Sequence, residues 1–407
     1  MNIINNIKKG CITVITLLVL FTSCNKLNVD PVPVTVPTTP AGNTVAKVLA
    51  ATPTDSLYYR LVIKSGILSA TPATITDSSL RFTMFVPDNN AMKAFINAIS
   101  GGAVPLNAPD AVFSGFITAN IPVSSALPIV SYNIVPQALP TTSFPTAFPN
   151  LQYPTIFNPA PALSALLRLT TFPSKRGPIT WVNNVPLSSA DAVATNGIIH
   201  HTAAVVVPPS QYLWDRINTD PDMTYFKAAV QRADSGTGTL QAAMLNIGAN
   251  LTVFVPTDSA MKAAITAQLT VALIAQGYPP ATAAAAAAGL AATPDVFTNP
   301  AVAGSLTPTV VKGIVAYHIL GIRVFTVNFP TTTTVVPTLI GGAPYPGVGL
   351  LATLAGPIAA AASVKGAGAY NTTPSNILLN PTPGTGKSDQ LYLNGVIHKI
   401  DQALFPQ

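Results

Sequence analysis

The 407-residue sequence contains no glutamate, so all fourteen of its acidic residues are aspartates. Charged residues make up 8% of the chain, against about a quarter in an average soluble protein. The missing glutamate excludes any site built on a Glu acid, base or metal ligand, and it leaves paired-carboxylate glycoside chemistry to scattered aspartates. Lys and Arg are spread thinly, without a basic block, and this distribution excludes nucleic acid as a partner.

Cysteine is also scarce, since the chain has only Cys11 and Cys24. Lys8 and Lys9 precede an apolar run that is too short to span a bilayer, and Thr22-Ser23-Cys24 follows it. This pattern resembles a bacterial lipoprotein signal, which implies removal of residues 1–23 and lipidation of Cys24. An ordinary secretory signal with a coincidental cysteine is the alternative. With Cys11 removed and Cys24 lipidated, an exported chain could form no disulfide.

Residues 24–43 are rich in Pro and Thr and have neither helical nor alternating apolar periodicity. We expect them to form an extended tether between the anchor and the first domain.

The rest of the chain contains an internal duplication. "FTMFVPDNNAMKAF" (82–95) matches "LTVFVPTDSAMKAA" (251–264) at eight of fourteen positions. "VSYNIVP" from 130 then matches "VAYHILG" from 315, and "NGIIH" (196–200) matches "NGVIH" (394–398). Three motifs in the same order predict two domains of one type, over 44–208 and 209–407.

The first motif predicts a short strand that a proline ends, followed by a helix capped by Asp88 in the first copy and Thr257 in the second. The third motif predicts a tight bend, where glycine adopts a positive φ easily, and then a strand. On that strand His398 lies on an apolar face, so we predict a core histidine with a backbone partner rather than a metal ligand. The structural markers of this motif are Asn196, Gly197 and His200 in the first copy, and Asn394, Gly395 and His398 in the second.

The three ordered motifs resemble those of the fasciclin I (FAS1) domain family over residues 44–407. The resemblance implies an α+β fold in which each domain is a wedge of two short β-sheets with packed helices. It also implies a role in adhesion or protein interaction rather than catalysis, with Tyr317 and His318 as candidate contact residues. Tyr317 as a core residue is the alternative. In the first copy Asn133 replaces the histidine, so this role does not extend to the first domain.

Both copies are enlarged between the motifs. The second contains "YPPATAAAAAAGLAATPDVF", which predicts an added Ala-rich helix. The first contains "FPTAFPNLQYPTIFNP", where Phe144, Phe148 and Tyr153 alternate with prolines. Long aromatic loops are frequent binding sites, so these three residues are candidate contacts; the alternative is that they pin the loop to its own domain.

Several segments look like catalytic or ligand-binding motifs but lack a residue or an element that the motif requires. "PTPGTGKSD" (381–389) has Pro where a phosphate-binding loop needs its first Gly, and a strand-like segment follows it instead of a helix. The chain has no Gly-x-Ser-x-Gly nucleophile elbow. His200 and His201 are adjacent on a predicted strand and point to opposite faces, so they cannot chelate one ion together. We therefore predict no catalytic residue, no metal and no cofactor.

The sequence as a whole indicates a lipid-anchored protein of the bacterial cell envelope, at the outer membrane, facing either the periplasm or the cell surface. It would touch the membrane through its anchor and bind a protein, matrix or glycan partner. A structural subunit of an envelope complex is the alternative, and a hydrolase is a more distant one.

Overall fold

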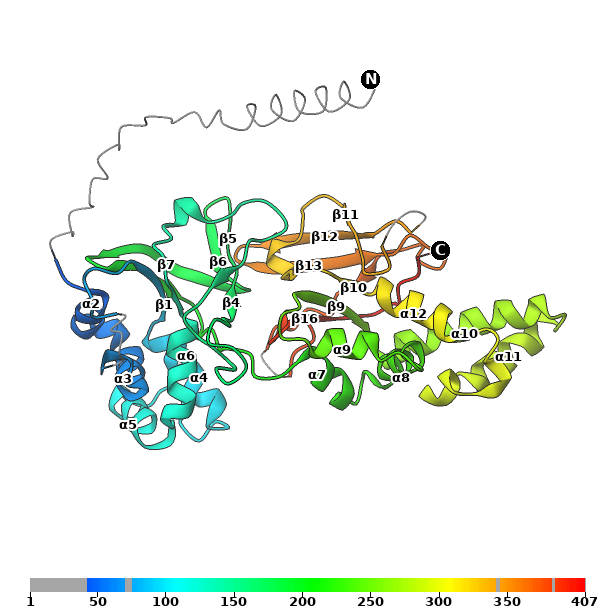
Figure 1. Ribbon diagram of the computed structural model, residues 1–407, viewed down its shortest axis with the longest axis horizontal. Helices are drawn as coiled ribbons and strands as arrows, with labels where there is room; N and C mark the ends of the chain where they lie inside the picture. Colours follow the sequence, from blue (N-terminus) through cyan, green and yellow to red (C-terminus); the bar gives the residue numbers. More distant parts are fainter. Residues whose placement is uncertain (1–41, 70–74, 342–344, 383–384, 407) are drawn as a thin grey trace, which may run out of the picture. The chain divides into compact units, whose positions relative to one another are not determined.

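The computed structural model describes residues 42–69, 75–341, 345–382 and 385–406, all of them within one compact unit. The predicted signal, Cys24 and nearly all of the tether lie outside the described residues. Two α+β halves follow one another along the chain, blue to green and then green to red in Figure 1. The segment that joins them runs from the end of a strand at Thr202 to a helix that begins at Leu213, and the predicted boundary at 208/209 falls inside it.

The first half contains helices on both sides of its first strand in the sequence. They are α2 (Val45–Ala51), α3 (Ser56–Ser65), α4 (Asn89–Ile99), α5 (Asp110–Asn120) and α6 (Val123–Tyr132), with short 3-10 turns η1 (Pro53–Asp55), η2 (Ile67–Ser69) and η3 (Thr141–Ser143). One sheet has the order β2-β1-β8-β7-β6-β5, and β3 pairs with β4 separately. The strands are β1 (Phe82–Pro87), β2 (Ile134–Val135), β3 (Tyr153–Pro154), β4 (Thr170–Thr171), β5 (Pro173–Arg176), β6 (Ile179–Val182), β7 (Val185–Ala194) and β8 (Gly197–Thr202).

The second half repeats this plan with additions. Its helices are α7 (Leu213–Thr219), α8 (Thr224–Ala233), α9 (Thr239–Leu245), α10 (Asp258–Ala275), α11 (Pro280–Leu290) and α12 (Pro308–Tyr317), with 3-10 turns η4 (Pro294–Phe297), η5 (Pro300–Val302) and η6 (Thr326–Asn328). Its two four-stranded sheets have the orders β10-β9-β16-β15 and β11-β12-β13-β14. The strands are β9 (Leu251–Pro256), β10 (Ile319–Leu320), β11 (Thr334–Val336), β12 (Val348–Ala355), β13 (Ile358–Lys365), β14 (Ser375–Asn376), β15 (Gln390–Tyr392) and β16 (Gly395–Ile400).

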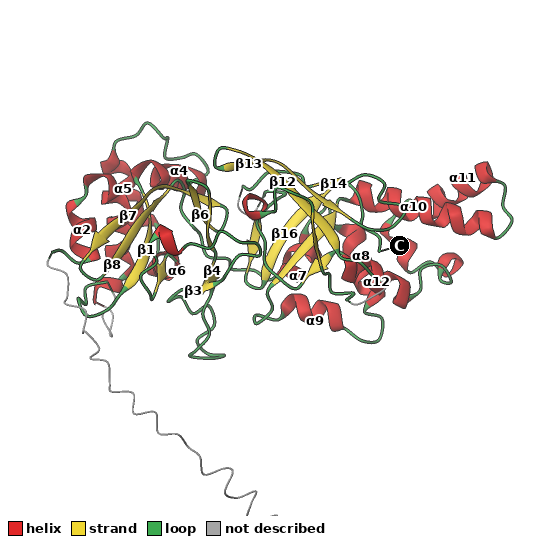
Figure 2. Ribbon diagram, turned by 90° about the horizontal axis from the view of Figure 1, so that it is seen from above, coloured by secondary structure: helices red, strands yellow, loops and turns green. Residues whose placement is uncertain are grey.

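The predicted α+β class is confirmed, and the two halves differ in their sheets. The second half has two short sheets, as the wedge description requires. In the first half the ten-residue β7 shifts register twice against β8 and also pairs with β6, so the strands form one continuous sheet of six. The predicted Ala-rich helix is α11, which lies beside α10 in Figures 1 and 2.

Each half begins its sheet with the predicted strand and capped helix. Every residue of β1 and β9 is buried, and each strand ends at a proline. The Asp88 carboxylate accepts a hydrogen bond from the Ala91 backbone N–H at 2.8 Å, and the Thr257 hydroxyl accepts one from Ala260 at 3.2 Å. Both predicted N-caps are therefore present, and each satisfies a backbone donor that the first helical turn leaves unpaired.

The central strand pair is parallel in both halves, β1 with β8 and β9 with β16. The register is also the same. Phe85 lies opposite His200 in the first half, and Phe254 lies opposite His398 in the second. The third motif of each half thus lies directly beside the first, although most of the half separates them in sequence.

The glycine of each Asn-Gly motif is needed for a different reason from the one the sequence suggests. Neither Gly197 nor Gly395 has a positive φ. A Cβ at Gly197 would lie 2.3 Å from the Phe82 carbonyl oxygen, and one at Gly395 would lie 2.4 Å from the Leu251 carbonyl oxygen. The parallel neighbour strand leaves no room for a side chain, so close approach of the backbone replaces the predicted bend as the explanation.

We expect Gly395→Ala to destabilise the protein by about 1–3 kcal/mol, because the contacting atom is backbone and the strand pair must shift to admit the methyl group. Urea unfolding followed by circular dichroism measures the change. Gly115→Ala is a matched control, since Gly115 is an exposed residue of α5 whose added Cβ would meet nothing within 4 Å. That variant should be neutral or more stable by up to about 1 kcal/mol. Equal effects at the two sites would contradict the close-approach explanation.

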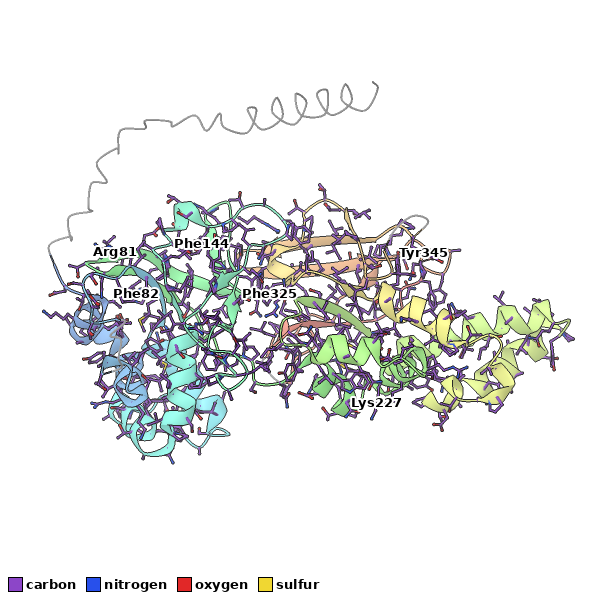
Figure 3. The ribbon with its side chains drawn as sticks, in the orientation of Figure 1. Arg81, Phe82, Phe144, Lys227, Phe325 and Tyr345 are labelled. Atoms are coloured by element: carbon purple, nitrogen blue, oxygen red, sulfur yellow. The ribbon has the colours of Figure 1, made fainter. Side chains whose placement is uncertain are left out.

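The two halves contact each other through a shared apolar cluster. Phe172 and Trp181 of the first half pack with Phe325, Val327 and Val396 of the second, and all five are buried. Phe325 is labelled in Figure 3. The Trp181 indole N–H also donates to the Pro357 carbonyl oxygen at 2.7 Å. The halves are therefore joined by a packed interface as well as by the chain.

Among the described residues, no single helix has both the length and the apolar composition to cross a bilayer, while the bent pair α5 and α6 passes that test only when the two are taken together.

Candidate functional site

Tyr317, a candidate contact residue, lies in the core. It is the last residue of α12, and its side chain has no exposed surface. Its hydroxyl donates to the Gly347 carbonyl oxygen at 3.0 Å and accepts from the Ala367 backbone N–H at 3.0 Å. In the first half Tyr132 is buried likewise, with its hydroxyl donating to Thr170 at 3.0 Å. The tyrosine thus ties the end of a helix to a backbone carbonyl group distant in sequence in each half.

His318, the other candidate by resemblance, is also fully buried. Its Nδ1 donates to the Ile314 carbonyl oxygen at 2.8 Å, and its Nε2 accepts from the Leu404 backbone N–H at 2.9 Å. Burial lowers the pKa of His318 to about 4. Asn133 takes this place in the first half, where its amide donates to Ile129 and Val206. In this structure neither Tyr317 nor His318 has surface to offer a partner.

The two motif histidines occupy equivalent places inside the two sheets. Nε2 of His200 donates to the Leu139 carbonyl oxygen at 2.8 Å, and Nε2 of His398 donates to Val324 at 3.0 Å. In each case Nδ1 accepts a backbone N–H, from Asp191 at 3.1 Å and from Asp389 at 3.2 Å. These partners fix the neutral Nε2–H tautomer. Burial is the main cause that lowers the pKa of both rings.

Each of the two aspartates beside these histidines also binds a threonine, a contact that was not predicted from the sequence. Asp389, at φ 54°, accepts the Thr326 backbone N–H at 2.7 Å and the Thr326 hydroxyl at 2.6 Å. Asp191, at φ 61°, accepts the same two groups of Thr141. In both copies the aspartate stands nine residues before the histidine. That shared spacing is the signal that could have found the pair.

The three aromatic candidates of the first-half loop are used within the protein. Phe144 (labelled in Figure 3) is 4% exposed and packs edge-on against His200, with ring centroids 5.3 Å apart. Tyr153 packs against the same first-half cluster. Phe148 packs against the second-half cluster that contains Phe254 and Tyr317. The loop is therefore held to both halves, and of its aromatic candidates Phe148 also lines a surface hollow described below.

A serine–histidine–aspartate row lies at the edge of the first half. The His201 ring bridges the Ser189 hydroxyl, 2.9 Å from Nδ1, and the buried Asp55 carboxylate, 3.1 Å from Nε2. The bond to Asp55 is the main cause that raises the pKa of His201. Lys399 holds the corresponding strand position in the second half and pairs with Asp220 at 3.0 Å. Because lysine serves equally well there, we interpret the row as an ion pair that ties a strand to the segment before a helix.

A polar hollow of about 380 Å³ lies where the first-half loop and β5 meet the segment after η6. The lining residues are Pro145, Thr146, Ala147, Phe148, Asn150, Ser174, Lys175, Arg176, Asn328, Pro330, Thr331 and Thr332. The loop is tied to β5 by the Lys175 backbone N–H, which donates to the Pro145 carbonyl oxygen at 2.9 Å. The Ser174 hydroxyl donates to the side-chain oxygen of Asn328 at 2.8 Å, which joins the two halves across its floor.

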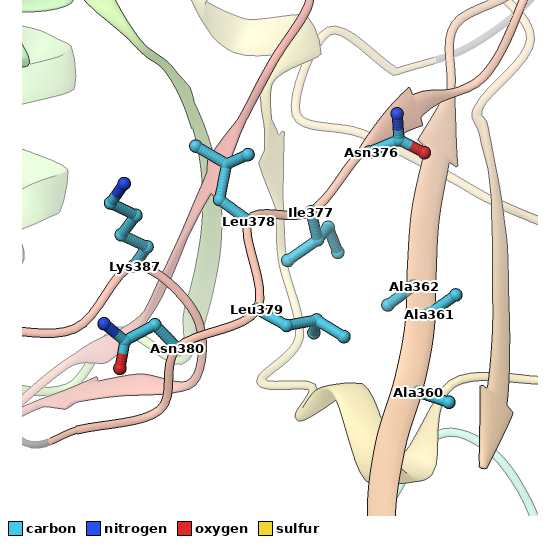
Figure 4. A pocket seen from close by; sticks show the side chains of 9 residues that line it. All are labelled: Ala360, Ala361, Ala362, Asn376, Ile377, Leu378, Leu379, Asn380 and Lys387. Atoms are coloured by element: carbon cyan, nitrogen blue, oxygen red, sulfur yellow. The ribbon is translucent and has the colours of Figure 1, made fainter. Parts of the chain in front are cut away.

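A second hollow, of about 480 Å³, lies along β13 (Figure 4). Ala360, Ala361 and Ala362 form one wall, and Figure 4 shows Lys387 and Asn380 on the opposite side. Two of its polar side chains are already paired: Asn376 donates to Asp401 at 2.8 Å, and Asn380 accepts from Thr382. The polar hollow near β5 is the better candidate because Asn150, Arg176 and Asn328 in its wall have buried donor atoms without a partner among the described residues.

No group of three or more His, Cys or Asp side chains is placed to hold a metal ion within the described part of the chain.

Comparisons with known proteins give similarity to solved structures. No family model matches the sequence, and no characterised relative matches it. Among solved structures, the chain is similar to a FAS1 domain pair from the insect cell adhesion molecule fasciclin I, described as a novel fold. The two are 15% identical, the alignment covers 86% of this chain and 96% of that one, and the TM-score is 0.33. A likeness with this TM-score and identity does not assign the chain to a family.

Proposed function

We propose that the chain is a lipid-anchored interaction protein of the bacterial cell envelope, built from two FAS1-like domains that bind a protein, matrix or glycan partner. The observation that carries the proposal is the contrast between the residues that the two copies share and the residues that line the polar hollow. The tyrosine, the asparagine and the histidine that the two copies share in their second and third motifs are buried in hydrogen bonds, whereas the polar hollow is lined by residues outside the three repeated motifs. A duplicated core that presents an unduplicated surface site suits a binding module.

The anchor is tested at the N-terminus of the mature protein. We expect mass spectrometry of protein extracted from membranes to show a chain that begins at a lipid-modified Cys24. Cys24→Ser should abolish both the modification and membrane retention. An unmodified Cys24, or a mature chain that starts elsewhere, would refute lipid anchoring, while protease shaving of intact cells separates a surface location from a periplasmic one.

The binding role is tested with the full chain against immobilised glycans and purified matrix proteins. We expect saturable binding to at least one class, and weakened binding when Phe148 is replaced by Ala. Absence of binding across all classes would overturn the proposal. A hydrolase is the alternative to exclude: substrate turnover that is lost in Ser189→Ala would favour it.

A structural subunit of an envelope complex is a second candidate. Leu163 and Leu166, on the loop between β3 and β4, are 69% and 88% exposed. Exposed leucines close together in the sequence favour a surface that another protein covers. Crosslinking in intact membranes would support this candidate if one partner appeared in fixed stoichiometry.

A further inference from the structure

The polar hollow near β5 presents hydrogen-bond donors in excess of acceptors. Its charged lining residues are Lys175 and Arg176, and no Asp is among the residues that line it. The aspartate whose charge couples to Lys175 is Asp191, and its carboxylate is already bonded to Thr141. The positive charge of the hollow is therefore not neutralised by a carboxylate in its wall.

Three donors in this wall are buried without a partner among the described residues. They are Nη1 of Arg176, the amide nitrogen of Asn150 and the amide nitrogen of Asn328. Asn328 is 7% exposed, and its amide oxygen already accepts from Ser174, so its N–H groups are the ones that remain. Buried donors in proteins are normally paired, and three unpaired donors around one hollow point to a ligand that supplies acceptors.

The geometry of Arg176 indicates which kind of acceptor group the ligand carries. Its Nη2 donates to the Phe329 carbonyl oxygen, which holds the planar guanidinium in place and leaves Nη1 as the free arm. Burial lowers the pKa of Arg176 from its usual high value, and an arginine remains charged at neutral pH. A guanidinium with neighbouring amide donors matches a carboxylate, which accepts through two oxygens.

The remaining walls indicate what the carboxylate is attached to. Phe148 and two prolines give apolar surface, and Thr146, Thr331 and Thr332 place hydroxyl groups at the exposed rim. The volume of about 380 Å³ is far larger than a carboxylate needs and lies within the range of small-molecule sites. A sugar ring has an apolar face that stacks on aromatic side chains and hydroxyl groups that bond to polar ones.

We propose that this hollow binds an acidic sugar unit, a uronic acid of a glycan, with its carboxylate on Arg176, Asn150 and Asn328. The inference rests on the binding role proposed above and names the ligand class of that site. Phe148 supplies the surface on which the ring lies, and Lys175 adds long-range attraction for the anion.

The test titrates the full chain with glucuronate, glucose and acetate by isothermal titration calorimetry. We expect glucuronate to bind at least tenfold more tightly than glucose, which lacks the carboxylate, and than acetate, which lacks the ring. Glucose binding as tight as glucuronate would overturn the anion assignment. Acetate binding as tight would overturn the sugar assignment and favour an acidic protein side chain.

Two variants locate the site. Arg176→Met removes the charge at similar length, and Asn150→Asp places a repelling carboxylate in the wall while keeping the side-chain shape. Each should weaken glucuronate binding at least tenfold, and the second remains informative if the first fails to fold. Arg168→Met removes an equal charge from an exposed arginine outside the hollow and should leave binding unchanged.

Two further outcomes would each count against the proposal. If Arg168→Met weakened binding as much as Arg176→Met, the attraction would be general and the hollow would not be the site. If none of the three compounds bound while the full chain still bound a matrix protein, the sugar site would be refuted and the interaction role would stand.

Discussion

Trp181→Ala should cost about 3–5 kcal/mol of stability and should separate the unfolding of the two halves. Trp181 is fully buried, and its ring packs with Phe172 of its own half and with Phe325, Val327 and Val396 of the other. Truncation leaves a cavity inside the interface that joins the halves. We expect one calorimetric transition for the unmodified protein and two for the variant.

Trp181→Phe is the matched variant for this experiment. It keeps an aromatic ring in the cluster and removes the N–H that donates to the Pro357 carbonyl oxygen. The loss should be smaller, about 1–3 kcal/mol, because it consists of one part-buried hydrogen bond and the volume by which the two rings differ, and the single transition should persist. If Trp181→Ala shifted one transition without splitting it, the cluster would stabilise the protein without being what couples the halves.

Acidification from pH 7.5 to 4 should destabilise the protein through its buried histidines. The pKa of His318 falls from 6.5 to about 4 on folding, so the unfolded chain binds the proton more readily. The contribution of His318 is complete above pH 6.5, and it is lost as the pH falls to about 4. The loss is on the order of 3 kcal/mol for this residue. The pKa values of His200 and His398 are lowered as well, which acts in the same direction.

Two other sets of groups bear on this pH window. His201 acts in the opposite direction, because its hydrogen bond to Asp55 raises its pKa in the folded protein. Its contribution to the stability of the fold is therefore complete below pH 6.5 and is lost as the pH rises through the pKa of the folded state. The carboxylates titrate lower. Asp77, Asp191 and Asp220 have lowered pKa values, so their contributions are lost mainly below pH 4, and glutamate is absent from the chain. Histidines therefore dominate between pH 4 and 6.5.

His318→Asn isolates the contribution of His318 to this acid sensitivity. Asn133 already takes this place in the first half and bonds to a helix carbonyl and to the segment after the last strand. An asparagine at 318 can likewise donate to Ile314 and accept from Leu404 without titrating. Urea midpoints at pH 7.5, 5.5 and 4 should show a flatter profile for His318→Asn. A profile that stays as steep would assign the acid sensitivity to other groups.

The elements that are specified by a local pattern could be predicted from the sequence. Asp88 and Thr257 each follow a strand that ends at a proline. This pattern defines the start of a helix through residues that are adjacent in the sequence. The Ala-rich helix α11 is another case, because alanine favours helix whatever packs on it. The duplication was visible because the same local patterns recur in the same order.

The features that depend on distant residues could not be predicted. Gly395 is required because Leu251 lies beside it in space, and no local rule contains that neighbour. Asp389 ends the segment 381–389, whose Gly and Pro residues carry no sign of burial, yet it is 6% exposed and its carboxylate accepts the Thr326 backbone N–H. The hollow near β5 joins the two halves, so its donors, such as Asn328 and Arg176, belong to no single motif.

The parallel pairing of the first and last strands has a consequence for how the protein is made. Phe82 pairs with Gly197 and Leu251 pairs with Gly395, so each sheet closes only when the final strand of its half has been synthesised. Pairings this far apart in sequence form slowly. The central strand pair of each half therefore cannot form while its chain is still emerging from the ribosome, so neither half can complete its sheet until its last strand has been synthesised.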